Sequence, residues 1–202
     1  MKTVILTGGM GSGKSAVCAF LKARGVPVYD SDSRTKALYE RDPALVDALQ
    51  AALGTGLRTA DGRLDRAKLA SLIFRDPARK ALVESVVHPA VLRDFRRWKR
   101  WQRPKGWTFG PVPFVVLESA IILSCPVFDG VGDRTVLVDA SEEIRLARAT
   151  ARDGSDPEAA LRRIRQQRFD LSRVDAVISN NGTLEELAAE TDRVFLNLFV
   201  SL

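Results

Sequence analysis

Short apolar runs alternate with amphipathic stretches in the first and last parts of this chain. The runs at residues 4–6, 26–29, 114–117, 135–138 and 176–178 are typical of buried strands. Apolar residues recur at helical spacing over residues 16–23 and 184–198, and two more helices are expected after Ser141 and around residues 162–168. The chain therefore begins as a strand–helix–strand unit and predicts an α/β fold with five strands.

A long segment between the second and third of these strands follows a different pattern. Residues 33–107 are helical in pattern and poor in strands, with proline and glycine as breaks. The crossover between two parallel strands needs only about a dozen residues. We therefore expect an inserted helical subdomain, which is a suitable place to hold a second substrate.

The first strand leads directly into a glycine-rich stretch, Gly8-Gly9-Met10-Gly11-Ser12-Gly13-Lys14-Ser15. It fits G-x-x-x-x-G-K-[ST], the phosphate-binding loop, and a helix is expected to follow it. Glycines let backbone N–H groups surround a phosphate at the amino end of that helix. Lys14 can reach the β- and γ-phosphates, and the Ser15 hydroxyl suits Mg²⁺. This stretch predicts nucleotide binding.

Two carboxylates, Asp30 and Asp32, follow the second strand. In an extended segment residues two apart share a side, so both can face the space beyond the carboxyl end of the strand, where open α/β sheets bind ligands. A kinase needs a carboxylate there to orient the attacking hydroxyl and accept its proton. The alternative is that Asp32 only caps a helix starting near Ser33.

Further candidates lie in the second half of the chain. Glu118 ends the third strand, where it can hold the Mg²⁺ shell or the substrate, or cap the next turn. Arg145, Arg148 and Arg152 share one helix face, and a second basic helix follows. Such an arginine-rich hairpin can neutralise charge on a transferring phosphoryl group. The alternative is a solvated basic pair of helices with salt bridges between neighbouring turns.

The chain carries a formal net charge of +6, which favours anionic partners. The last helix of the insertion is basic and interleaves its cations with Phe95, Trp98 and Trp101. This mixture could form a nucleic-acid surface, but the favoured interpretation is that the aromatic rings pack inward and the charges are solvated. Because His88 is the single histidine of the chain, we expect it to be a packed, hydrogen-bonded residue.

Composition and length set the remaining limits. The 202 residues are 46% hydrophobic and 28% charged, as in an ordinary globular protein, and no apolar run approaches the length of a membrane span. We expect a cytoplasmic protein. Cys18 and Cys125 are isolated in the sequence, so we expect buried free thiols and no structural metal site.

Taken in order, these motifs resemble the dephospho-CoA kinase family, and the resemblance spans nearly the whole chain. The motifs that carry it are Thr7 through Ser15, Asp30-Ser31-Asp32, Leu64 through Phe74, His88-Pro89, Arg163-Ile164 with Gln167, and Asp175 through Gly182. The resemblance implies a P-loop kinase similar to nucleoside monophosphate kinases, with a five-stranded parallel sheet, a helical substrate domain and a lid. It also implies ATP-dependent phosphorylation of the ribose 3′-hydroxyl of dephospho-CoA, the last step of coenzyme A synthesis.

The resemblance assigns parts of the chain to this activity. The nucleotide-binding core would comprise residues 1–32, 108–140 and 170–202, the CoA-binding domain residues 33–107, and the lid residues 141–169. ATP and Mg²⁺ would be required, with Ser15 as the metal ligand. The ATP contacts would be Gly11, Ser12, Gly13, Lys14, Ser15 and Ala16. The catalytic residues would be Lys14, Asp32, Arg148 and Arg152, and the substrate contacts Asp30, Asp32, His88 and Glu118.

Two positions depart from the family pattern. Ala16 stands where many members have threonine, and Ser124 stands where many have an acid after the third strand, so that Glu118 would have to serve instead. The runner-up function is another small-molecule kinase of the same architecture, since a fold does not fix its substrate. A nucleic-acid-associated P-loop NTPase is a further alternative. The sequence leaves the oligomeric state open.

Overall fold

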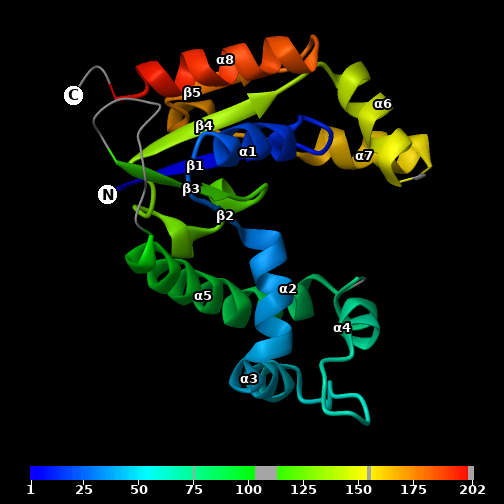
Figure 1. Ribbon diagram of the computed structural model, residues 1–202. Coiled ribbons are helices and arrows are strands. Elements are labelled where there is room, and N and C mark those ends of the chain that lie inside the picture. Colours follow the sequence, from blue (N-terminus) through cyan, green and yellow to red (C-terminus); the bar gives the residue numbers. More distant parts are fainter. Residues whose placement is uncertain (75, 103–112, 154–155, 200–202) are drawn as a thin grey trace. The chain divides into compact units, whose positions relative to one another are not determined.

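The computed structural model describes residues 1–74, 76–102, 113–153 and 156–199, without the side chains of residues 152 and 153. The chain divides into two compact units (Figure 1). Residues 1–29 and 102–202 form the core unit, and residues 30–101 form the helical unit.

The core unit is built on a five-stranded parallel sheet, which confirms the expected fold class. Its strands are β1 (Lys2–Gly8), β2 (Val28–Asp30), β3 (Phe114–Glu118), β4 (Arg134–Asp139) and β5 (Ala176–Ser179), in the spatial order β2-β3-β1-β4-β5. β2 begins two residues later than its apolar run predicts. Pro27 has no N–H to donate to a ladder, although its carbonyl accepts a hydrogen bond from Val116 N at 2.9 Å.

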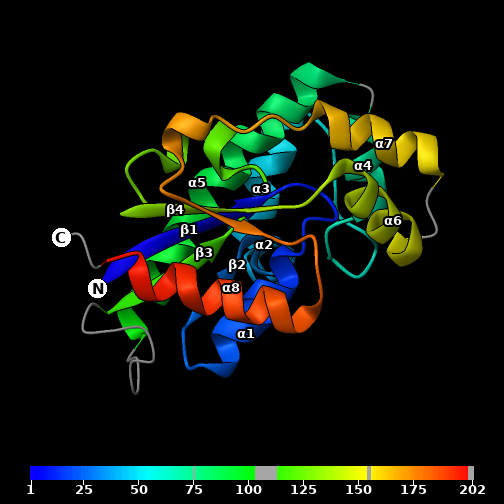
Figure 2. The same ribbon diagram turned by 90° about the horizontal axis from the view of Figure 1, so that it is seen from above.

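Helices α1 (Lys14–Ala23) and α8 (Leu184–Asn197) cover one face of this sheet (Figure 2). Alternate residues of β1, including Val4 and Leu6, point to that face and are fully buried. The ring of Phe195 on α8 stacks on Phe114 of β3, with ring centroids 5.7 Å apart. Helices α6 (Glu142–Asp153) and α7 (Pro157–Gln166) form a hairpin at one end of the unit. Three short 3₁₀ helices complete it: η1 (Ile122–Ser124), η2 (Pro126–Phe128) and η3 (Leu171–Arg173).

The helical unit contains α2 (Ser31–Arg41), α3 (Pro43–Leu53), α4 (Arg66–Ile73) and α5 (Pro77–Trp101). Aspartates start all four of these helices. The side chains of Asp30, Asp42, Asp65 and Asp76 each accept a hydrogen bond from the backbone N–H three residues later. This pattern satisfies N–H groups that a helix leaves unpaired at its amino end, and it explains why charged segments of the insertion still form ordered helices.

Two expectations about individual side chains have different outcomes. Cys18 and Cys125 are buried free thiols, as predicted. The aromatic residues of α5 pack inward only in part, because Phe95 is buried whereas the side chain of Trp101 is 77% exposed. Arg103 and Lys105, two further cations of the basic helix that the sequence predicts, lie outside the described residues.

Within the described ranges, the structure has no helix with the length and apolar character needed to span a membrane.

We predict that Phe195→Ala lowers the free energy of unfolding by about 3–5 kcal/mol, because it opens a cavity between α8 and the sheet. The neighbouring residue provides the control, since Leu196 is 48% exposed on the same helix. Leu196→Ala should change stability by no more than about 0.5 kcal/mol. Urea unfolding followed by circular dichroism measures both. Equal losses for the two variants would contradict the described packing of α8.

Candidate active site

The loop between β1 and α1 presents unpaired backbone donors. Gly11 and Gly13 adopt left-handed conformations with φ of 74° and 98°, and Gly13 caps α1. Within the described residues, the N–H groups of Gly11, Gly13 and Ser15 have no hydrogen-bond partner. Because the dipole of α1 is also positive at this end, the loop has the donors and the charge to bind an anion.

The loop glycines also allow close packing against other parts of the core unit. A Cβ atom on Gly11 would clash with the backbone carbonyl of Arg145 and lie 2.8 Å from its Cα. A Cβ atom on Gly13 would clash with the side-chain amide of Asn180. Glycine is therefore required here by α6 and by the turn after β5, in addition to any requirement of a bound phosphate.

Asn180 holds the phosphate-binding loop through a side-chain hydrogen bond. Its side chain is buried and donates from Nδ2 to the carbonyl of Ser12 at 2.8 Å. The guanidinium of Arg148 donates to the backbone carbonyl of Asn180 at 3.1 Å and to its Oδ1 at 3.3 Å. The sequence analysis includes Asn180 only within the motif Asp175 through Gly182 and gives it no role. The signal that could have found it is the Asn-Asn-Gly stretch at the carboxyl end of a strand.

Arg145 and Gln167 hold the peptide groups on both sides of Met10, an arrangement we call the Met10 clamp. Gln167 Oε1 accepts a hydrogen bond from Met10 N at 2.8 Å, and Arg145 Nε donates to Met10 O at 2.9 Å. Arg145 also donates to Gln167 Oε1 at 2.9 Å. The helix face predicted to carry Arg145, Arg148 and Arg152 thus brings its first two members to the loop and to Asn180. The side chain of Arg152 lies outside the described residues.

Lys14, Ser15 and Arg148 line a cavity of about 210 Å³ beside the loop. Lys14 Nζ donates to the carbonyl of Gly8 at 2.8 Å and to that of Gly9 at 3.3 Å. Ser15 is exposed. Ser12 keeps a buried hydroxyl that has no partner in the described part of the chain, whereas the N–H of Ala16 donates to Gly13 O at 3.0 Å. The cavity thus combines two cations with unpaired polar groups, which suits a phosphate chain.

The structure gives different roles to the two carboxylates at the end of β2 and the start of α2. Asp30 is the N-cap of α2, and its oxygens accept hydrogen bonds from Ser33 N at 2.9 Å and from Ser33 Oγ at 2.8 Å. The alternative that Asp32 caps a helix starting near Ser33 is therefore wrong, because α2 starts at Ser31 and Asp30 takes that role. Asp32 lies in the first turn, exposed, and its carboxylate has no partner among the described residues.

The other two candidate substrate contacts, His88 and Glu118, occupy different elements. His88 lies half-buried in the middle of α5, directly before Pro89, and burial lowers the pKa of its imidazole. Glu118 ends β3 and lies half-buried opposite Leu6 of β1 in the sheet register. Glu118 is thus held at the carboxyl edge of the strand that neighbours the loop strand.

The arginines of α7, unlike Arg145 and Arg148 of α6, fit the alternative prediction of solvated basic side chains in salt bridges. Arg165 donates to both carboxylate oxygens of Glu142, at 2.8 and 3.1 Å, across the hairpin. These hydrogen bonds lower the pKa of the Glu142 carboxyl group. Arg162 approaches Glu158, one turn earlier, at 3.6 Å. Both pairs are exposed, so they add little stability.

Comparison with known proteins gives a consistent result. The family model described as dephospho-CoA kinase matches residues 2–186. The dephospho-CoA kinase of Frankia casuarinae is 36% identical, over 98% of this chain and 84% of that protein. The crystal structure of TT1252 from Thermus thermophilus matches with a TM-score of 0.77 and 32% identity, over 98% of this chain and 97% of that one. The dephospho-CoA kinase of Campylobacter jejuni, at 19% identity, has the same fold with a TM-score of 0.58, over 98% and 97% of the two chains.

We predict that Gly11→Ala weakens ATP binding at least about tenfold, because its Cβ atom would push the loop away from α6. Gly130→Ala is the matched control. Gly130 has φ of 72°, close to that of Gly11, but the described atoms leave open space around its Cβ position. Both substitutions carry the same backbone strain of about 1 kcal/mol. Calorimetric titration with ATP separates the effect of backbone strain from that of the steric clash with Arg145. Equal ATP affinities in the two variants would contradict the close contact with Arg145.

Proposed function

Because the chain belongs to the dephospho-CoA kinase family, we propose that it transfers the γ-phosphoryl group of ATP to the ribose 3′-hydroxyl of dephospho-CoA. The 3′-oxygen forms a bond to the γ-phosphorus as the bond from that phosphorus to the β,γ-bridging oxygen breaks, giving coenzyme A and ADP. The observation that carries the proposal is the family match over residues 2–186, which includes the phosphate-binding loop and the Asp30-Ser31-Asp32 motif.

The loop residues would bind the phosphates of ATP. Unpaired N–H groups of Gly11, Gly13 and Ser15 supply donors, and Lys14 supplies a positive charge that can move from the loop carbonyls to the phosphates. Arg148 lines the same cavity and would neutralise charge on the transferring group. Arg152 lies one helical turn further along α6, and we propose it as the second cation of the lid.

The donor set suits Mg²⁺ bound mainly through ATP. Among the described residues no group of three His, Cys, Asp or Glu side chains could hold a metal. Mg²⁺ in kinases commonly takes one or two protein oxygens and completes its shell with phosphates and water. The exposed hydroxyl of Ser15, beside Lys14, would be the protein ligand. When bound, the ion would neutralise phosphate charge.

Asp32 is the better candidate for the residue that orients the 3′-hydroxyl and accepts its proton. Both oxygens of Asp30 are engaged by Ser33, whereas the Asp32 carboxylate is exposed and without a described partner. A positioned carboxylate within hydrogen-bond reach is what general base catalysis requires.

We assign the remaining parts of the chain in the same way. The helical unit would bind dephospho-CoA, with His88 as a further substrate contact. Glu118, which belongs to the core unit, is proposed as another substrate contact. Helices α6 and α7 would act as the lid over ATP. The parallel sheet and its loop would form the nucleotide-binding core.

The activity is tested by measuring ADP release with dephospho-CoA beside a panel of nucleoside monophosphates and shikimate. The panel is needed because a shikimate kinase from Acinetobacter baumannii has the same fold, with a TM-score of 0.55. Among the compounds of this panel, we expect only dephospho-CoA to be phosphorylated. We expect this activity to be lost in Lys14→Ala. Preferred turnover of a panel compound would assign the chain to another small-molecule kinase activity.

We predict that Asp32→Asn lowers turnover about a hundredfold with little change in thermal stability, because asparagine keeps the size of the side chain but cannot take a proton. Asp30→Asn is the control, since asparagine still caps α2. Steady-state kinetics with dephospho-CoA measures both. Near-normal turnover in Asp32→Asn together with a collapse in Asp30→Asn would show that the other carboxylate is the base.

A further inference from the structure

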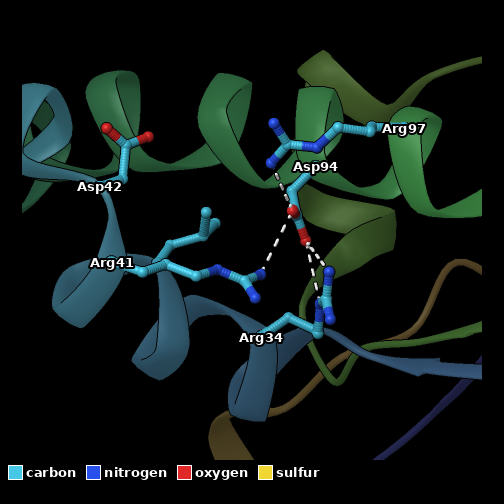
Figure 3. Close-up of a pocket in the computed structure, with 6 residues that line it drawn as sticks. Arg34, Arg41, Asp42, Asp94 and Arg97 are labelled. Atoms are coloured by element: carbon cyan, nitrogen blue, oxygen red, sulfur yellow. Dashed lines mark hydrogen bonds and ion pairs between the residues drawn. The ribbon is translucent and has the colours of Figure 1, made fainter.

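The helical unit buries one carboxylate among three guanidinium groups (Figure 3). The side chain of Asp94 on α5 is only 2% exposed, and Arg34 of α2 donates to its Oδ2 through two nitrogens, at 2.9 and 2.7 Å. Arg41 of α2 and Arg97 of α5 donate to Oδ1, at 3.3 and 3.0 Å. Asp94 therefore ties α2 to α5 near the beginning of α2 and at its end, an arrangement we call the Asp94 anchor.

The apolar side chains of α2 contribute little to fixing this helix. All 11 of its residues are described, and only Ser31 and Leu38 among them are buried. A helix of a globular protein is usually held by a broad apolar face. A buried carboxylate has lost its hydration, so it requires its guanidinium partners close by and in good geometry. The Asp94 anchor thus has the role on α2 that an apolar face has on other helices.

The anchored face of α2 is opposite to Asp32. Successive residues of an α-helix are turned by about 100° around its axis, so Arg34, Leu38 and Arg41 fall about 180–240° from Asp32. The carboxylate of Asp32 is exposed and has no partner among the described residues. Its direction is therefore set by the rotation of α2 about its own axis, which the Asp94 anchor fixes from the other side.

We propose that Asp94 is a positioning residue for phosphoryl transfer: by holding Arg34 and Arg41, it fixes the rotation of α2 and so the direction in which Asp32 presents its carboxylate. The role of Asp32 in this inference rests on the proposed function. A displacement of about 1 Å in a reacting group can cost a large part of the rate even when every group is present. Asp94 lies on the far side of α2 from Asp32 and acts only through the helix.

Arg34→Lys tests the anchor with little risk to folding, because it keeps a positive charge beside Asp94 and removes the paired donors. We expect kcat for dephospho-CoA to fall about tenfold while KM for ATP changes less than about twofold. Arg97→Lys is the matched control. Arg97 meets the same carboxylate from α5 itself, three residues away, so it does not tie α2 and its replacement should leave kcat unaltered. Equal values of kcat in the two variants would overturn the proposal.

A double-mutant cycle separates positioning from general damage to the helical unit. Asp94→Asn should lower kcat in the unsubstituted chain and lower it no further in the Asp32→Asn background, where there is no base to misdirect. A loss of the same size in both backgrounds would overturn the proposal. If Asp94→Asn does not fold, Arg34→Lys takes its place in the cycle. Asp47→Asn controls for the loss of a carboxylate, since Asp47 pairs with Arg58 at 2.7 Å outside α2 and should leave kcat unaltered.

Amide hydrogen exchange tests the anchor without relying on turnover. Arg34→Lys should speed exchange in α2 and leave exchange in α4 unchanged, whereas Arg97→Lys should alter neither helix. Unchanged exchange of α2 in Arg34→Lys would overturn the anchor. If the unsubstituted chain does not phosphorylate dephospho-CoA, the proposed function fails. Faster exchange of α2 would then still support the anchor, and unchanged exchange would overturn it.

Discussion

The peptide groups around Met10 are fixed from both sides, and the shape of the phosphate-binding loop depends on this. Gln167 accepts from the N–H and Arg145 donates to the carbonyl. Arg145 belongs to α6, and Gln167 follows α7 directly. The glycines at 9 and 11 are needed in this arrangement because the side chain and backbone of Arg145 occupy the space that a Cβ atom would take. The hairpin and the loop are thus joined by hydrogen bonds and close contacts, and α6 cannot be displaced without disturbing the backbone that is proposed to surround the phosphates.

Features with a local cause could be predicted from the sequence. The strands follow from short apolar runs, and the loop follows from residues that are adjacent in the chain. The assignment between Asp30 and Asp32 was harder. Both residues suit the start of a helix, and a helix boundary read from sequence is uncertain by more than the two residues that separate them. Only the hydrogen bonds of Ser33 decide which one is the cap.

Features that depend on residues far apart could not be predicted. Gln167 and Asn180 reach loop residues more than 150 positions earlier in the chain. Both stand in motifs that carry the family resemblance, but neither motif indicates which residue of the loop they contact. Asp94 was hidden among the many charges of α5, where solvated cations are the usual interpretation. Its burial arises from packing between α2 and α5 within the helical unit. Conversely, Trp101 continues the aromatic spacing of α5 yet is exposed, because spacing alone does not supply a neighbour to pack against.

The position of Lys14 bears on the thermodynamics of nucleotide binding. Its ammonium group already donates to the carbonyls of Gly8 and Gly9. A phosphate that recruits this ammonium group must take it from those two oxygens, so binding at this residue is an exchange of acceptors. The enthalpy of such an exchange is a difference between two sets of hydrogen bonds and is smaller than either set. The net contribution of Lys14 to nucleotide affinity is therefore smaller than its hydrogen bonds to a phosphate alone would give.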